Sequence, residues 1–146
     1  MPVKRIEFIE FHFEIKTLSL KDRQKLKAFI LSIFKKEGTL VSSVNYIFCS
    51  DRQLLKINQD FLRHDYYTDI LTFELAKKGA PVKGEVYVSV DRVRDNARIL
   101  NQFYYQELHR VIFHGALHLC GYRDKSKKEK IAMRAKEDLY LLRYFK

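Results

Sequence analysis

The pattern of apolar and polar residues, together with β-forming residue types, predicts four β-strands in short stretches of the chain. In residues 9–15, apolar side chains alternate with Glu10, His12 and Glu14, and a period of two residues indicates a half-buried strand. Residues 43–49, 68–73 and 85–90 are rich in β-branched and aromatic side chains, so we expect three further strands there. The intervening lysine- and glycine-containing residues 76–84 predict a hairpin loop, and hence an antiparallel pair.

Apolar residues at spacings of three and four predict five amphipathic helices in the remaining stretches. The helix expected over residues 104–120 has its core-facing stripe at Leu108, Val111, Ile112, Gly115 and Leu119. For the last helix, the predicted inward face is Ile131, Ala135, Leu139 and Leu142. Side chains that accept hydrogen bonds from free backbone N–H groups mark four expected helix starts, at Ser19, Ser50, Asp91 and Ser126.

The order of these elements predicts the fold class. Two strands joined by a helix form a right-handed parallel crossover, whereas a hairpin joins antiparallel strands. With 146 residues and 47% hydrophobic residues, the chain is long enough for one domain with its own core. We therefore expect a single α+β domain over residues 1–146, in which helices pack on a small mixed sheet that is mostly parallel with one antiparallel strand.

Charge and composition restrict the partners. The chain has 28 Lys and Arg against 18 Asp and Glu, a net charge of +10, which favours a nucleic acid over a membrane surface. The alternative is that the charge serves only solubility. Residues 1–7 lack the apolar core of a signal peptide, no apolar run could cross a bilayer, and there are only two cysteines, Cys49 and Cys120. These features predict a cytoplasmic protein.

The stretch H-G-A-L-H-L-C-G-Y-R-D at residues 114–124 carries the candidate chemistry. His114 and His118 are four residues apart, so on a helix their imidazoles project from one face. Gly121 suits the left-handed turn that ends a helix and would bring Asp124 back toward the pair. Two imidazole nitrogens, one carboxylate oxygen and an open fourth position predict a catalytic zinc site.

The neighbouring residues define what this site could do. Zinc proteases of the H-E-x-x-H type place a glutamate general base after the first histidine, but that position here is Gly115, which disfavours proteolysis. The remaining metal chemistry is activation of water and neutralisation of charge on a phosphoryl oxygen. Two other histidines are less suited: His109 points to another side of the helix, and His64 faces either a cleft or solvent.

These residues resemble the YbeY family of rRNA maturation factors, which are single-domain, metal-dependent endoribonucleases. The family signature H-G-x-L-H-L-x-G-Y-D-H agrees with residues 114–124 at every fixed position except the last two. Two upstream blocks are also similar. An Asn, a spacer, an Arg and T-D-V-L-S-F correspond to Asn58, Arg63 and residues 68–73, and G-D-I-x-I-S corresponds to residues 84–89.

The resemblance implies specific roles. His114 and His118 would be metal ligands, and Asp124 would replace the family's third histidine; an alternative alignment with one insertion would place Lys125 there, but an ammonium cannot ligate. The carboxylate leaves manganese, nickel and iron open besides one Zn²⁺. Arg63 would grip the scissile phosphate, or else pair with Asp60 or Asp65. Glu85 would orient a ligand, or simply begin a strand.

We therefore expect a cytoplasmic, metal-dependent endoribonuclease that is specific for single strands and acts in rRNA maturation and ribosome quality control. Its partners would be single-stranded RNA or rRNA and the ribosome or its small subunit. The alternative is a non-catalytic RNA- or ribosome-binding factor whose metal is structural. Chelation separates the two, because removal of a structural ion lowers the melting temperature sharply.

Overall fold

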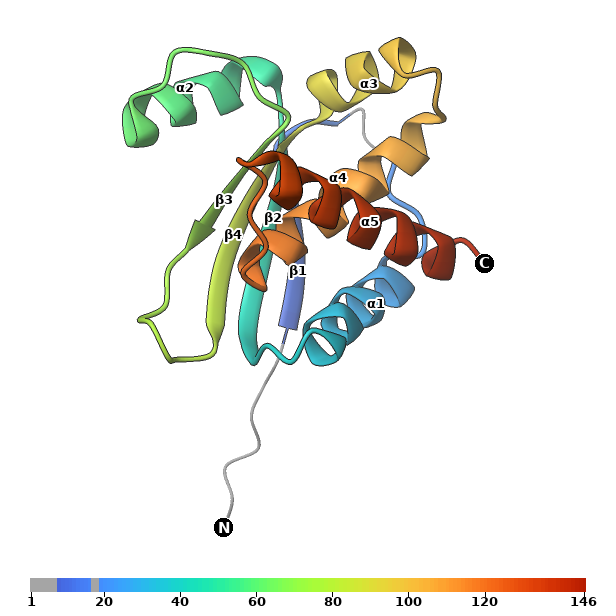
Figure 1. Ribbon diagram of the computed structural model, residues 1–146. Coiled ribbons are helices and arrows are strands. Elements are labelled where there is room, and N and C mark those ends of the chain that lie inside the picture. The colour runs from blue at the N-terminus through green and yellow to red at the C-terminus, as the bar shows by residue number, and fades with distance from the viewer. Residues whose placement is uncertain (1–7, 17–18) are drawn as a thin grey trace.

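The computed structural model describes residues 8–16 and 19–146, in which four strands and five helices are present (Figure 1). Residues 1–7, in which the sequence shows no apolar core of a signal peptide, lie outside this part of the chain. Within it, no helix has the length and hydropathy needed to cross a bilayer. The elements follow the predicted order: β1 (Phe8–Phe13), α1 (Arg23–Lys36), β2 (Val41–Cys49), α2 (Asp51–Leu62), β3 (Ile70–Glu74), β4 (Val82–Ser89), α3 (Val90–Ile99), α4 (Tyr104–Leu119) and α5 (Lys127–Tyr144).

The four strands form one mixed sheet in the order β1-β2-β4-β3. β1 and β2 are parallel, as are β2 and β4, whereas β3 runs antiparallel to β4. The connection from β1 through α1 to β2 is therefore the predicted parallel crossover, and β3 and β4 form the predicted hairpin. This arrangement confirms the α+β class with a mostly parallel sheet.

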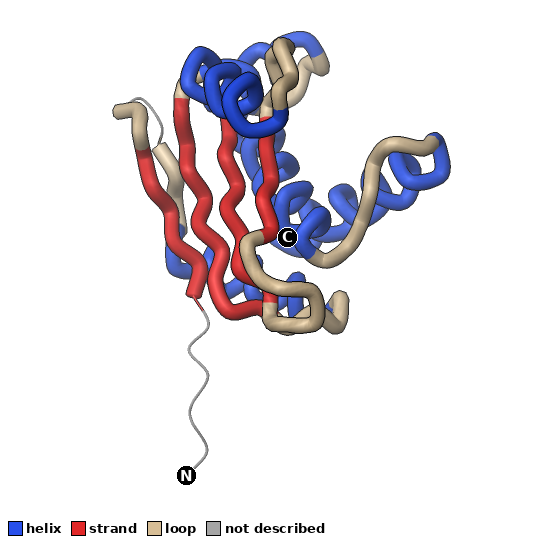
Figure 2. The backbone as a smooth tube through the Cα atoms, turned by 90° about the vertical axis from the view of Figure 1, so that its left-hand side faces the viewer, coloured by secondary structure: helices blue, strands red, loops and turns tan. Residues whose placement is uncertain are grey.

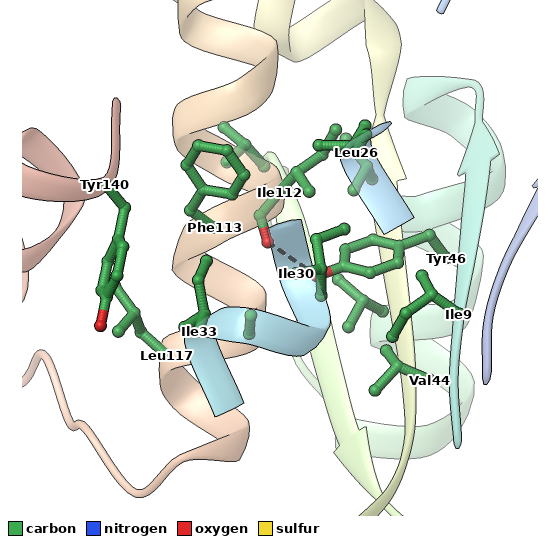
Figure 3. Packing of buried hydrophobic residues seen from close by; sticks show 14 of the residues in the cluster. Ile9, Leu26, Ile30, Ile33, Val44, Tyr46, Ile112, Phe113, Leu117 and Tyr140 are labelled. Atoms are coloured by element: carbon green, nitrogen blue, oxygen red, sulfur yellow. Dashed lines mark hydrogen bonds between the residues drawn. The ribbon is translucent and has the colours of Figure 1, made fainter. Parts of the chain in front are cut away.

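The helices gather mainly on one side of the sheet (Figure 2), where the larger hydrophobic core lies. Ile30 and Ile33 of α1 and Phe113 and Leu117 of α4 belong to this core together with Val44 and Tyr46 of β2 (Figure 3). The ring of Phe113 packs against Phe29 of α1 and Tyr144 of α5. The fully buried Tyr46 of β2 donates a hydrogen bond of 2.8 Å to the carbonyl of Ile112. This bond satisfies the one polar atom that the tyrosine brings into the core and ties α4 to the sheet.

Helix α4 lies very close to the sheet because position 115 has no side chain. A Cβ added to Gly115 would lie 2.7 Å from Cγ1 of Val86 and 3.1 Å from Cδ1 of Ile70, which is closer than non-bonded carbon atoms approach. The predicted stripe of α4 is buried throughout. With Gly115 against the sheet, His114 and His118 lie on the flank of the helix and stay partly exposed.

Two of the four expected helix starts are confirmed, and two are wrong. Ser50 and Ser126 each form a complete capping box with the residue three positions on. The cap of α3 is Ser89 rather than Asp91, whose carboxylate instead accepts a hydrogen bond from the backbone N–H of Asp51. Ser19 precedes α1 by several residues; that helix starts at Arg23, after the buried side chain of Leu20 has entered the core.

The predicted inward face of α5 is also wrong. Ile131 is 62% exposed and Leu142 is 72% exposed. The residues that are buried on this helix are Met133, Glu137, Tyr140, Leu141 and Tyr144. Apolar periodicity alone misplaced the face because this interface includes polar groups with partners: Glu137 pairs with Arg110 of α4, and the Tyr140 hydroxyl donates to Glu37.

The close approach at Gly115 predicts that Gly115→Ala lowers the free energy of unfolding by about 1 to 2 kcal/mol, because overpacking outweighs the better helix propensity of alanine. Urea unfolding measures the change. The control is Ala132→Gly at an exposed position of α5, which reports propensity alone. A Gly115→Ala variant more stable than the parent would contradict this account.

Candidate metal centre

Three side chains converge where α4 ends and the chain turns back. Oδ2 of Asp124 lies 3.3 Å from Nε2 of His114 and 3.4 Å from Nε2 of His118. The two imidazole rings stand nearly perpendicular, with centroids 4.4 Å apart. In the described part of the chain, these three residues are the group of His, Cys, Asp and Glu side chains that could hold a metal ion.

The distances from the Asp124 oxygen to the two imidazole nitrogens fit a divalent transition metal. For a tetrahedral ion with bonds of about 2.0–2.1 Å, neighbouring ligand atoms are about 3.3–3.4 Å apart. The two nitrogen-to-oxygen distances are of this size. Side-chain exposures of 17% for His114, 26% for His118 and 39% for Asp124 leave one side of the group open, as a catalytic site requires.

Each imidazole is oriented by an acceptor on its other nitrogen. Nδ1 of His118 donates to the carbonyl of Tyr122 at 2.9 Å, and Nδ1 of His114 donates to Oε2 of Glu137 at 2.6 Å. A carbonyl or carboxylate oxygen only accepts, so the Nδ1 atoms carry the protons. In the neutral tautomer each Nε2 then offers its lone pair toward Asp124, as metal coordination requires.

The turn that carries Asp124 is fixed to the body of the protein. Gly121 has φ +103°, the left-handed conformation that the sequence predicted for it, and the N–H of Tyr122 bonds the carbonyl of Leu117 at 3.0 Å. The Tyr122 hydroxyl donates to Glu37 at 2.6 Å. Glu37 also accepts from Tyr140 and, at 3.1 Å, from Lys136, so one carboxylate joins α1, the turn and α5.

Glu37 stays ionised within this network. Burial of its carboxylate works against ionisation, but the hydrogen bonds from Tyr122, Tyr140 and Lys136 outweigh it, so the pKa of Glu37 is lowered from 4.5. The pKa of His114 is raised for a comparable reason. Burial disfavours the imidazolium, yet the bond and charge of Glu137, with Asp124 and Asp69, favour it more strongly. The carboxylates around His114 therefore favour positive charge on its ring.

The three residues open into a cleft of about 930 Å³. Its walls come from the α2–β3 loop, β3, α4, the turn after α4, and α5. Asp69 and Glu107 line it, and burial raises the pKa of both carboxyl groups above the usual range. Carboxyl groups with raised pKa values are able to exchange protons in acid–base chemistry. Arg110 lies among them and pairs with Glu137 at 3.1 Å.

The other residues that the sequence singled out have different positions. Arg63 is exposed at the end of α2, with φ +55°, between Leu62 and His64, which both line the cleft. Glu85 does not lie with His114, His118 and Asp124. Its carboxylate accepts a hydrogen bond from the Tyr87 hydroxyl. Both side chains are on one face of β4, whereas Val86, which lies against α4 at Gly115, is on the opposite face. His109 is buried against Tyr144, away from the cleft.

Sequence reasoning missed the residue that orients His114. Glu137 has a side chain only 7% exposed and lies on the face of α5 that apolar periodicity had assigned to solvent. The one available signal was its charge: a glutamate between the buried positions Met133 and Tyr140 requires a partner, because unpaired buried charge is costly.

The fold and the site together define a single-sheet α+β protein with a His-His-Asp group in an open cleft that could hold a metal ion. A family model described as "Endoribonuclease YbeY" matches residues 9–144. The chain is 48% identical over 135 residues to an endoribonuclease YbeY from Cytophaga hutchinsonii, covering 92% of this chain and 94% of that protein. A Porphyromonas gingivalis relative of the same name is 46% identical over 134 residues, with 92% and 88% covered.

A solved structure agrees with these relatives. The solution structure of TM1509 from Thermotoga maritima superposes with a TM-score of 0.63 at 32% sequence identity, covering 96% of this chain and 89% of that one. The chain therefore belongs to the endoribonuclease YbeY family, which confirms the resemblance seen in the three sequence blocks.

Glu37→Gln should lower the free energy of unfolding by about 1 to 3 kcal/mol at pH 7, because charge-assisted hydrogen bonds are lost. A lowered pKa gives stability that is fully present above the ordinary value of 4.5 and lost as the pH falls through the folded-state value. The difference between variant and parent should therefore shrink below pH 4.5. Urea unfolding across this range measures it, with exposed Glu10→Gln as control. A difference that stays constant with pH would refute the assignment.

Glu137→Ala should weaken zinc binding about 10- to 100-fold, since partners that orient a metal-binding histidine contribute this much. Competition with a chromophoric chelator measures the affinity. The matched control is Asp138→Ala, which removes the other acceptor of Arg110, 2.9 Å away, without touching His114. Equal zinc affinities in the two variants would rule out the orienting role of Glu137.

Proposed function

We propose that the protein is a metal-dependent endoribonuclease that cleaves single-stranded RNA. The observation that supports this most directly is the convergence of His114, His118 and Asp124 in an open cleft of a chain that belongs to the endoribonuclease YbeY family. The position of Gly115 argues against a protease, because a glutamate there would be directed into the sheet at Val86 rather than toward a substrate.

In this proposal His114, His118 and Asp124 hold one divalent ion. Two imidazoles and a carboxylate suit zinc, and the oxygen donor also suits manganese, nickel or iron. When bound, such an ion supplies Lewis acidity, which lowers the pKa of water and offsets charge on a phosphoryl oxygen. Asp69, whose pKa is raised by burial, provides a carboxyl group in the same cleft that is able to exchange protons.

Arg63 is the residue that we assign to the scissile phosphate. The two carboxylates that could have neutralised it are engaged elsewhere: Asp60 pairs with Lys56 at 3.4 Å, and Asp65 accepts from Gln59. Across residues 8–16 and 19–146, no ion pair of Arg63 is present. Its exposed guanidinium is able to form paired hydrogen bonds with phosphate oxygens and stabilise developing negative charge.

The proposed biological substrate is rRNA in the cytoplasm, on or near the small ribosomal subunit. The family resemblance of the three sequence blocks supports this part of the proposal. The net charge of +10 also fits a polyanionic partner, since phosphate contacts dominate the affinity of proteins for nucleic acids.

Asp124→Ala should reduce both zinc affinity and cleavage of a labelled single-stranded RNA by more than about 100-fold, because it removes a direct ligand. The matched control is Lys125→Ala at the next position, which should keep full zinc stoichiometry. Zinc binding lost in the lysine variant and retained in the aspartate variant would reverse the assignment of the third ligand.

Chelation of the loaded protein should abolish cleavage, and added zinc should restore it. The metal-free protein should stay folded, because the three proposed ligands lie at the cleft and outside the hydrophobic core. Thermal unfolding followed alongside cleavage tests this. Cleavage that survives chelation would contradict a metal mechanism. Loss of folded structure on chelation would instead indicate a structural ion, as expected for a non-catalytic binding factor.

A further inference from the structure

Two aromatic rings stack on one another at the rim of the metal cleft. His64 and Tyr66, both in the loop between α2 and β3, have ring centroids 5.1 Å apart and planes inclined by 20°. The Tyr66 hydroxyl and Nδ1 of His64 are 3.0 Å apart, within hydrogen-bond distance. Both side chains are exposed, Tyr66 by 56%, and both line the cleft that contains His114, His118 and Asp124.

The backbone on both sides of this pair is held by one buried residue. Asn58 of α2 is fully buried; its side-chain amide donates to the carbonyl of Tyr66 at 2.9 Å, and its carbonyl accepts from the N–H of His64 at 3.1 Å. Arg63, at φ +55°, turns the chain immediately before His64. The two rings are therefore presented by an anchored loop, which lowers the entropy cost of binding a ligand there.

The chemistry of the pair fits a flat, partly polar ligand. Exposed aromatic faces beside a polar cleft bind planar rings by stacking, and nucleobases are the planar groups that accompany phosphates. The net charge of +10 complements the negatively charged phosphate backbone that carries nucleobases in RNA. Single-stranded RNA suits such a site because its bases are unpaired and are able to swing out from their neighbours in the strand.

We propose that the His64–Tyr66 stack is a nucleobase-binding platform, on which a base of single-stranded RNA stacks while a neighbouring phosphate lies at the metal group. This inference rests on the proposed function and adds a substrate-binding site to it. The α2–β3 loop forms one wall of the cleft, and α4 with its following turn forms another. A strand held at both walls crosses the cleft in a fixed register, because stacking fixes which nucleotide is adjacent to the metal ligands.

Binding of a single-stranded 2′-O-methyl RNA to the zinc-loaded protein, followed by fluorescence anisotropy, tests the platform. The double variant His64→Ala with Tyr66→Ala should weaken binding about tenfold or more, the size expected for loss of base stacking. Tyr66→Phe, which keeps the ring, should bind within about twofold of the parent. The control is Tyr105→Ala, which removes an aromatic side chain 53% exposed and outside the cleft lining; it should bind like the parent.

Single abasic substitutions along the same RNA provide a second readout that a merely structural role would not move. At one position, removal of the base should weaken binding to the parent protein by the same factor as the two alanine substitutions do. The same abasic RNA should bind the double variant no more weakly than intact RNA does. Cleavage of unmodified RNA by the parent protein, measured alongside, reports on the proposed function independently.

The outcomes separate the two proposals. If the parent cleaves RNA, but the double variant binds as tightly as the parent or every abasic position affects both proteins equally, the platform is refuted and the endoribonuclease proposal stands. If the parent neither binds nor cleaves single-stranded RNA, the proposed function is refuted, and the platform with it.

Discussion

The packing of α4 directly on the sheet at Gly115 is the constraint on which the rest of the site depends. A side chain at this position would meet Val86 of β4 and force the helix away from the strands. The glycine fixes the rotation of α4, because its core stripe must face the sheet while His114 and His118 remain on the flank. The histidines are thereby held on a rigid element beside a cleft, which is how a metal site gains precision.

Polar contacts from three other parts of the chain then orient the two imidazoles that this packing positions. Glu137 of α5 and the carbonyl of Tyr122 each bond one imidazole, and Glu37 at the end of α1 holds the Tyr122 hydroxyl. The same groups that stabilise the packing of α5 and the turn therefore also orient the two histidines that we propose as metal ligands. Stability and ligand geometry are coupled here because they share the same hydrogen bonds.

The sequence predicted those features that depend on local chemistry. Strand alternation and helical spacing identified the elements and the mixed sheet, and the motif identified His114, His118 and the turn that brings Asp124 to them. Features that depend on contacts between distant segments were not predictable in this way. Glu137 was missed because α5 buries paired polar groups, and Glu85 was expected near the site although its place in β4 directs it to the opposite face.

The central claim is that His114, His118 and Asp124 bind one catalytic divalent ion. Anomalous scattering from crystals of the zinc-loaded protein, measured on both sides of the metal absorption edge, tests it most directly. The account predicts one peak about 2.0–2.2 Å from Nε2 of both histidines and from a carboxylate oxygen of Asp124. A peak that lacks Asp124 among its ligands, or that lies outside this cleft, would contradict it.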